Sequence, residues 1–219
     1  MQDFIEVTGM VLKAVPVLDT DKRITLLTKE RGKIGAFARG AKRQGSKYMA
    51  STEPFIYGTF RLVEGRNAYY VSDIKTDQVF KEVREDLEAV FYASYFADVA
   101  DYYTRENNDE KEMLKLLYMS LKALALDAIP NELVQYIFEM KTLVVNGEFP
   151  GVLEGHKLTD STAYTIQYVQ NTPIEKLYTF TVSEEVLGEL AQECEVYRKK
   201  YIGHNFKSLE ILKNCRLKN

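Results

Sequence analysis

The sequence has little of what extracellular, metal-binding or membrane proteins use. Its 219 residues include only two cysteines, Cys194 and Cys215, and only two histidines, His156 and His204. Two cysteines without a CxxC pair, with histidines in unrelated contexts, exclude a zinc ribbon, so no metal and no cofactor is expected. No apolar run approaches the roughly 20 residues of a membrane span, and the first residues lack the features of a signal peptide. We therefore expect a cytoplasmic protein with reduced thiols, in which Cys194 is a small buried side chain of a helix.

Catalytic motifs are also missing. The sequence contains no GxSxG, P-loop, HExxH or GxGxxG pattern, and each histidine is expected to lie alone in a loop. Asp19 and Asp21 stand two residues apart before a predicted strand, where acids are either common turn residues or a metal pair. The sequence therefore predicts a protein that is not an enzyme, and a metal-dependent nuclease using Asp19 and Asp21 remains as an alternative.

Residues 1–78 have the pattern of β-structure. Short apolar, β-branched and aromatic runs alternate with turns, and Gly9 indicates a bend or bulge. Five strands are predicted, at Phe4–Leu12, Ile24–Thr28, Ile34–Gly40, Pro54–Val63 and Ala68–Ile74. Five short strands with glycine at the bends are typical of a small closed barrel, and for this size of an OB-fold.

Residues 79–219 change to a helical period. Helices are predicted at about 82–103, 110–127, 130–145, 183–201 and 206–212, with Pro130 opening one helix and Ser183 capping another. The alternating runs 162–168 and 177–182 predict a short β-hairpin. The predicted fold class is therefore α+β: an OB-fold nucleic-acid-binding domain at 1–78 and an α-helical domain at 79–219 with a small irregular or β insert.

The segment Thr28–Tyr48 concentrates positive charge. It holds seven cationic side chains against one acid, Glu30, in a chain whose net charge is −3. Residues 1–80 carry 13 Lys/Arg against 9 Asp/Glu, a net of +4, whereas the remainder carries 16 against 23, a net of −7. Such a cluster is either solvated surface or a site for a polyanion, whose phosphates release counterions on contact. Phe37 and Tyr48 add flat faces on which a base can stack.

Several blocks of the chain resemble the RecO family of bacterial recombination mediators. The order and spacing match over about 50 residues of the family's N-terminal domain, in the blocks Thr8–Leu12, Asp19–Arg23, Leu27–Ile34, Ala38–Arg43 with Ser46, and Glu53–Phe55. The second half is similar more loosely, at Phe138–Lys141 with Leu143 and Gly147, at Tyr201–Gly203 and at Lys207–Leu209.

The resemblance implies a DNA repair and recombination mediator that makes and breaks no chemical bond. Such a protein binds single- and double-stranded DNA through its OB-fold and anneals strands coated by single-stranded-DNA-binding protein, whose C-terminal tail docks on the helical domain. With RecR it helps to load RecA, in a bacterial cytoplasm and on the nucleoid during repair. Many relatives carry a four-cysteine zinc module, but here Gly151–His156 contains no cysteine, so the zinc is not carried over. Tyr136 and Ile137 stand where some relatives place arginines, so the tail-docking residues are not assigned.

From these observations we predict a DNA-binding edge that tracks phosphates without reading bases. The predicted contacts are Lys29, Arg31, Lys33, Arg39, Lys42, Arg43, Lys47 and Tyr48. The first three side chains would decorate one hairpin and the others the next loop, together forming one groove edge. An RNA-binding OB-fold chaperone and an adaptor whose barrel touches only protein have the same composition and remain alternatives.

Overall fold

The structure, a computed structural model, describes residues 4–66, 68–126 and 128–216. They form two compact units. The first unit takes the chain up to Lys81 together with Ala97–Leu114, and the second takes Glu82–Phe96 and the chain from Lys115 onward. Helices α3 (Leu87–Tyr103) and α4 (Lys111–Leu126) therefore each contribute residues to both units.

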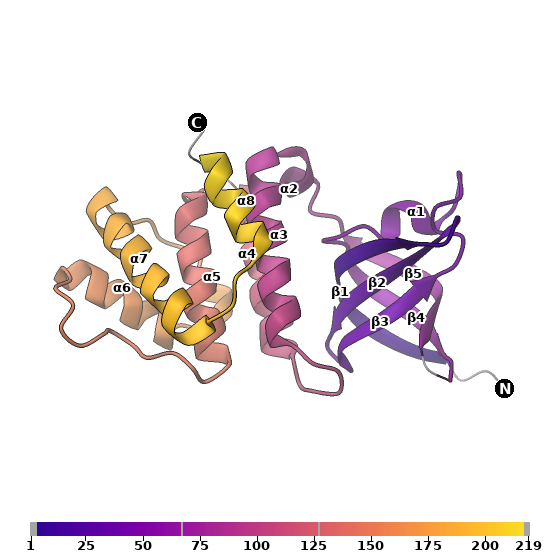
Figure 1. Ribbon diagram of the computed structural model, residues 1–219, viewed down its shortest axis with the longest axis horizontal. Helices are drawn as coiled ribbons and strands as arrows, with labels where there is room; N and C mark the ends of the chain where they lie inside the picture. The colour runs from indigo at the N-terminus through magenta and orange to yellow at the C-terminus, as the bar shows by residue number, and fades with distance from the viewer. Residues whose placement is uncertain (1–3, 67, 127, 217–219) are drawn as a thin grey trace. The chain divides into compact units, whose positions relative to one another are not determined.

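The first unit contains a closed five-stranded barrel (Figure 1), which confirms the predicted fold class. Its strands are β1 (Phe4–Val17), β2 (Asp21–Thr28), β3 (Gly32–Ala38), β4 (Tyr57–Glu64) and β5 (Tyr69–Gln78). They are joined in the order β1-β2-β3-β5-β4, and the seam between β3 and β5 is the parallel pair. Each predicted strand is present, and the long loop after β3 contains a single helical turn, α1 (Tyr48–Ser51).

The barrel core consists of the inward side chains of alternating strand positions. Its buried members are Val7, Val11, Ile24, Leu26, Ile34, Ala36, Ile56, Phe60 and Leu62. Gly9 faces Gly58 across the β1–β4 pair. A Cβ atom on Gly9 would lie 2.2 Å from the carbonyl oxygen of Leu27, so glycine permits the close strand approach that closes so small a barrel.

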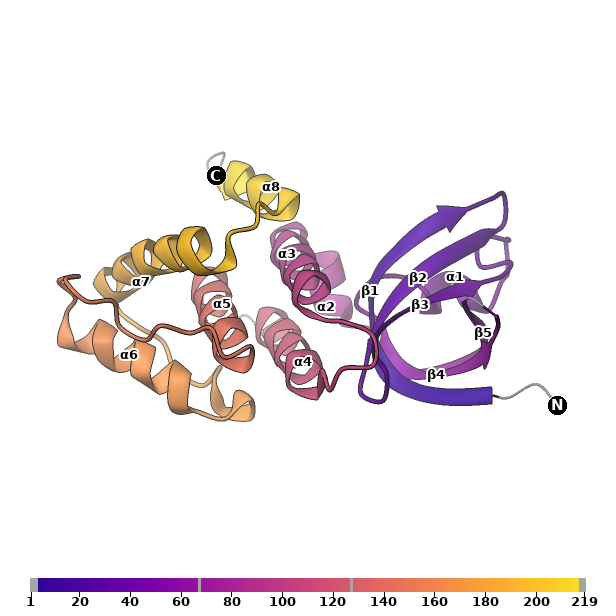
Figure 2. The ribbon, with the colours of Figure 1, turned by 60° about the horizontal axis from the view of Figure 1, so that its bottom comes forward.

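The second unit is helical (Figure 2). Besides its parts of α3 and α4 it contains α5 (Asn131–Val145), α6 (Asp160–Asn171), α7 (Glu184–Tyr197) and α8 (Lys207–Arg216), while the short α2 (Lys81–Glu85) precedes α3. Helix α5 packs against both α6 and α7. Pro130 occupies the N-cap position of α5, and the Ser183 hydroxyl accepts the Val186 N–H at the start of α7, which confirms both predicted helix starts.

The predicted hairpin in the second unit is wrong. Residues 160–171 form α6, whose buried positions Thr162, Thr165, Ile166 and Val169 recur with helical spacing. The Thr159 hydroxyl accepts the Thr162 N–H and caps this helix. Residues 177–182 form no strand and follow a short 3₁₀ helix, Ile174–Lys176. The prediction fails because the run 162–168 is too short to distinguish strand alternation from the helical period.

Two buried charged side chains of α5, Glu139 and Lys141, are paired with groups of neighbouring segments. The carboxylate of Glu139, 1% exposed, accepts from the Tyr95 hydroxyl at 2.9 Å, from Gln135 Nε2 at 2.7 Å and from Arg198 Nη1 at 2.5 Å. The Lys141 ammonium donates to the carbonyls of residues 169, 170 and 172, where α6 ends. Carbonyls at a helix C-terminus lack intrahelical partners, so this cation is well placed.

The predictions for Cys194 and for the two histidines agree with the structure. Cys194 is buried, and burial raises the pKa of its thiol. His156 and His204 both lie in loops; His156 Nδ1 contacts the buried Glu193 carboxylate, and His204 packs edge-on against Phe206. Among the described residues, no helix is both long and apolar enough to cross a bilayer.

Candidate nucleic-acid interface

The tip of the β2–β3 hairpin carries Lys29, Arg31 and Lys33. It is fixed to residues 105–108 of the same unit, because Lys33 N–H donates to the Arg105 carbonyl at 3.0 Å and Asn107 N–H to the Arg31 carbonyl at 2.9 Å. Gly32, with φ +62°, allows this approach, since a Cβ there would lie 2.2 Å from the Arg105 oxygen. The hairpin tip is therefore held by backbone contacts on the side facing this loop.

Lys33 is engaged in an ion-pair cluster. Its ammonium lies 2.9 Å from Asp101 Oδ1, and Lys13 lies 2.9 Å from the other oxygen of that carboxylate and 3.0 Å from Asp98. Partial burial by itself would raise the pKa of Asp101, but the hydrogen bonds from Lys33 and Lys13 outweigh it and hold this pKa below its ordinary value. Lys33 therefore stabilises the unit, whereas Lys29 is exposed and Arg31 is partly exposed.

The second group of predicted cations lies in the loop after β3. Arg39, Lys42 and Arg43 are exposed. Lys42 N–H donates to the Thr20 carbonyl at 2.8 Å, and Gly40 N–H donates to Asp21 Oδ1 at 2.8 Å. The loop is therefore tied to the β1–β2 turn.

Asp21 acts as the acceptor that fixes this loop. The Gly40 N–H, followed by the Thr20 hydroxyl and the charges of Arg39 and Arg43, lowers the pKa of its carboxyl. Among the described residues, no group of three or more His, Cys, Asp and Glu side chains has the arrangement of a metal site. The hydrogen bonds that Asp21 accepts from Gly40 and Thr20 give this carboxylate a structural role in the turn.

The two cationic groups do not share one edge. They stand at opposite ends of the β2–β3 ladder, which runs from the Thr28–Gly32 pair to the Lys22–Ala38 pair. At about 3.3 Å per residue, the six steps between these pairs separate the groups by roughly 20 Å. The predicted single groove edge is therefore a strip with cations at both ends.

Lys47 and Tyr48 lie at α1 and are partly committed to the barrel. The Tyr48 hydroxyl donates to the Ser72 carbonyl at 2.6 Å, and the Lys47 ammonium pairs with Asp73 at 2.8 Å. This ammonium also lies 5.0 Å from the centre of the Tyr48 ring. Both residues hold α1 against β5, and their contact with DNA stays a prediction.

At the Arg39 end of the strip lies an aromatic pair that the sequence did not bring together. Phe37 of β3 and Tyr70 of β5 stack with ring centres 5.8 Å apart at 28°, directly across the parallel seam. The Arg39 guanidinium carbon lies 4.5 Å from the centre of the Tyr70 ring. Arg23 is the partner of Phe37 on β2 and is exposed. A flat face flanked by guanidinium groups is what stacked bases and their phosphates require.

A groove of about 450 Å³ adjoins this face. Its lining includes Arg23, Phe37, Tyr69 and Arg66 of the β4–β5 loop, with Glu64 and Glu106 as the acids. Burial raises the pKa of Tyr69, with Glu106 adding to the effect, so the phenol stays neutral and can donate. The sequence flagged Phe37 as a stacking face but missed Arg23, Arg66 and Tyr70. One sequence signal was available for Arg23: it alternates on β2 with the buried Ile24, which indicates that its side chain faces outward.

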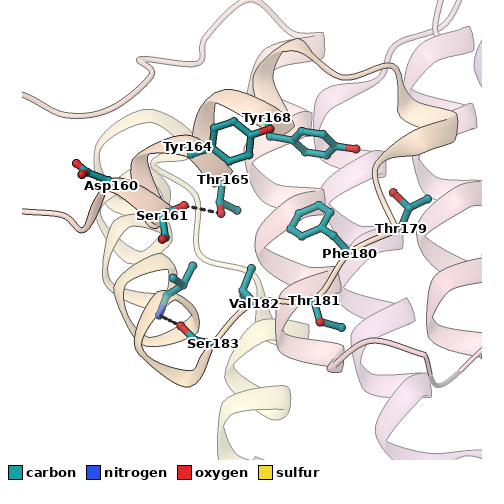
Figure 3. Close-up of a pocket in the computed structure, with 11 residues that line it drawn as sticks. Asp160, Ser161, Tyr164, Thr165, Tyr168, Thr179, Phe180, Thr181, Val182 and Ser183 are labelled. Atoms are coloured by element: carbon teal, nitrogen blue, oxygen red, sulfur yellow. Dashed lines mark hydrogen bonds between the residues drawn. The ribbon is translucent and has the colours of Figure 1, made fainter.

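Two grooves among the described residues of the second unit differ in charge. Figure 3 shows the larger, about 770 Å³, between α6, the segment 179–183 and the first turn of α7. Tyr164 (68% exposed), Tyr168 and Phe180 line it, and among the described residues of its lining only Asp160 is charged. The smaller groove, about 360 Å³, surrounds the π-helix Arg198–Ile202 and contains the cations Arg198, Lys199 and Lys213 with the acids Glu195 and Glu210.

The closed five-stranded barrel and the helical second unit place this chain among OB-fold proteins that carry an additional helical unit. The family model described as "Recombination protein O N terminal" matches residues 1–80, and that described as "Recombination protein O C terminal" matches residues 84–152. The chain belongs to the RecO family, which confirms the resemblance seen in the sequence.

Relatives named "DNA repair protein RecO" match almost the whole chain. The protein of Acetivibrio thermocellus is 28% identical over 96% of this chain and 97% of its own length. That of Clostridium perfringens is 28% identical over 95% of this chain and 97% of its own. That of Bacillus subtilis is 28% identical over 93% and 92%, respectively.

Proposed function

We propose that this protein is a DNA repair and recombination mediator of the bacterial cytoplasm. It binds single- and double-stranded DNA through the barrel, anneals complementary strands coated by single-stranded-DNA-binding protein, and acts with RecR to assist loading of RecA. Membership of the RecO family supports the repair role, since the relatives carry the name DNA repair protein. It performs this role by binding, without making or breaking a bond.

The observation that carries the proposal is the stacked pair Phe37–Tyr70, with Arg39 on its Tyr70 side and cations at both ends of the strip. Bases of a single strand stack on aromatic rings whatever their sequence, and the backbone phosphates meet the cations. The strip is roughly 20 Å long at about 3.3 Å per residue, enough for a few nucleotides. An annealing protein needs this kind of site, because it must hold many different sequences.

Annealing follows from charge. Two complementary strands repel each other through their phosphates, and a protein that neutralises part of this charge on both lowers the barrier to pairing. The exposed cations Arg39, Lys42 and Arg43 face one end of the strip, while Lys29 and Arg31 lie at the other. These cations would neutralise part of the charge that keeps two complementary strands apart.

The test is the salt dependence of binding to a fluorescent oligothymidine. If four to six cations touch phosphates, the slope of log affinity against log salt is about −3 to −4. Replacing Arg39, Lys42 and Arg43 by alanine should reduce the magnitude of this slope by about 2. A matched triple variant, Lys157→Ala, Lys176→Ala and Lys207→Ala, removes the same charge from exposed positions of the second unit. A slope near zero for the unaltered protein, or equal losses in both triple variants, would remove the basis of the proposal.

The DNA-binding proposal is tested against RNA by competition. DNA and RNA oligomers of one sequence compete for the barrel, and a preference for RNA would favour an RNA chaperone instead. Incubation of labelled DNA with Mg²⁺ or Mn²⁺ tests the nuclease alternative, and divalent-dependent cleavage lost in Asp19→Asn would establish it. Asp21 is a poor choice for that test, because its carboxylate fixes the basic loop.

For the acidic tail of the single-strand binder we propose the smaller groove of the second unit. Its cations suit an acidic peptide, whereas the larger groove has Asp160 and, in the part of the chain that the structure describes, no lysine or arginine in its lining. Lys199 and Lys213 lie 2.8 Å and 3.9 Å from Glu195, so the tail would compete with that carboxylate for them. Lys199→Glu with Lys213→Glu should weaken binding of a tail peptide about tenfold or more, and Asp160→Lys should leave it unchanged. Tighter binding in Asp160→Lys, with no loss in the Lys199 and Lys213 variant, would place the tail in the larger groove.

A further inference from the structure

Leu18, at the tip of the β1–β2 turn, is the most exposed large apolar side chain among the described residues. It is 83% exposed, and its backbone has φ +53°. An L-residue with a branched side chain is strained in this region, which glycine or asparagine adopts readily. A leucine at this position leaves the backbone strain unrelieved and buries little apolar surface. The stability of the fold therefore does not explain why residue 18 is leucine.

The turn is held rigidly against the basic loop. The Lys42 N–H donates to the Thr20 carbonyl at 2.8 Å, and the Lys42 ammonium reaches the Leu18 carbonyl at 3.4 Å. Asp21 accepts the Gly40 N–H at 2.8 Å and the Thr20 hydroxyl at 2.9 Å. An exposed apolar tip is thereby fixed beside Arg39, Lys42 and Arg43, which are exposed cations.

This combination has a known physical use. Apolar side chains, leucine among them, enter between base steps of duplex DNA, unstack them and kink the helix, while neighbouring cations hold the phosphates. Insertion needs a side chain that projects and a backbone that does not yield. Leu18 has both, since its turn is bound to the loop through two backbone amides. Val15, near the end of β1 and three residues before Leu18, is also exposed.

We propose that Leu18 is a wedge that unstacks duplex DNA held by Arg39, Lys42 and Arg43. This activity rests on the proposed DNA binding and goes beyond it: the barrel would distort the duplex as well as track its phosphates. Local unstacking at the protein would help a strand to be exchanged or realigned during annealing. The same tip would contact a protein in the rival interpretation, which the test below separates.

The test uses short duplexes that contain 2-aminopurine, whose fluorescence rises when its base unstacks. At equal fractions of bound DNA, the unaltered protein should raise the fluorescence about twofold or more. Leu18→Asn keeps a residue that tolerates positive φ but removes the wedge. It should lose most of this rise while its affinity stays within about twofold and its salt slope is unchanged, because no phosphate contact is lost. Leu18→Phe should keep the rise.

Leu87→Asn is the matched control, because Leu87 is 71% exposed and belongs to the second unit; it should behave as the unaltered protein. Leu18→Asn should melt at the same or a higher temperature, since asparagine relieves the strain. The proposal is overturned if Leu18→Asn gives the full rise, if the unaltered protein binds the duplex without any rise, or if Leu18→Asn mainly destabilises the fold. If the unaltered protein binds no DNA at low salt, the proposed function fails together with the wedge.

Discussion

The stacked pair Phe37–Tyr70 makes a prediction that separates stacking from charge. Tyr70→Ala removes one ring of the pair and the aromatic seat of Arg39. Loss of a base–aromatic stack costs about 1–3 kcal/mol. This loss weakens binding of single-stranded DNA by about 5-fold to 140-fold, at about 1.4 kcal/mol per factor of ten.

The assay is fluorescence anisotropy with oligothymidine over a range of salt concentrations. Tyr70→Ala should lower the affinity by the same factor at every salt concentration, because the ring neutralises no phosphate. Tyr70→Phe keeps the ring and should bind within about twofold of the unaltered protein. The Arg39, Lys42 and Arg43 triple variant should instead change the slope.

Tyr164→Ala is the control for loss of an exposed tyrosine, because Tyr164 lies in the helical unit and is 68% exposed. It should leave DNA binding unchanged. The reasoning is refuted if Tyr70→Ala binds as tightly as the unaltered protein, or if its loss of affinity disappears at high salt. Either result would mean that the aromatic face does not meet bases.

Three further predictions concern stability. Arg198→Met leaves the buried Glu139 carboxylate without its cation and should cost about 3–5 kcal/mol in urea unfolding followed by helical circular dichroism; the double variant with Glu139→Leu should recover much of this, and additive losses would contradict the pairing. Because the pKa of Asp101 is lowered in the folded protein, the stabilisation from its lysine pairs is complete above its unfolded pKa. It should be lost as the pH falls through the folded pKa, and an acid titration of the melting temperature in which Asp101→Asn behaves identically would exclude this origin. Gly9→Ala places a methyl group against the Leu27 carbonyl and should lower the melting temperature strongly, whereas Gly188→Ala, where a Cβ meets no atom within 4 Å, should keep or raise it.

The strands and most helix starts were predictable because their signals are local. Alternation of apolar residues sets the inward face of each barrel strand, and the hydroxyl of Ser183 caps a helix from three residues away. The prediction for segment 160–171 is wrong because a run as short as 162–168 does not separate a period of two from a period of 3.6. Thr159 as a cap was the local signal that would have identified the helix.

In the candidate site, too, the local features were predictable from the sequence, whereas the contacts between residues far apart along the chain were not. The amino-acid sequence shows directly that cations gather between residues 28 and 48 and that residues 1–80 carry a net positive charge while the remainder is negative. It did not determine which cations are engaged elsewhere: Lys33 meets Asp101 and Lys47 meets Asp73, partners that lie far along the chain.

The arrangement of the remaining site residues depends on how the strands pair in the folded barrel. Closure of the barrel sets β5 beside β3, which brings Tyr70 onto Phe37 and places Arg39 over the ring. The β2–β3 register places the two cationic groups at opposite ends of one strip. Backbone amides of the loop after β3 hold the β1–β2 turn, at whose tip Leu18 lies. Charge is a property of composition, which the sequence states directly, whereas a binding face depends on pairing between distant strands, which forms only when the barrel closes.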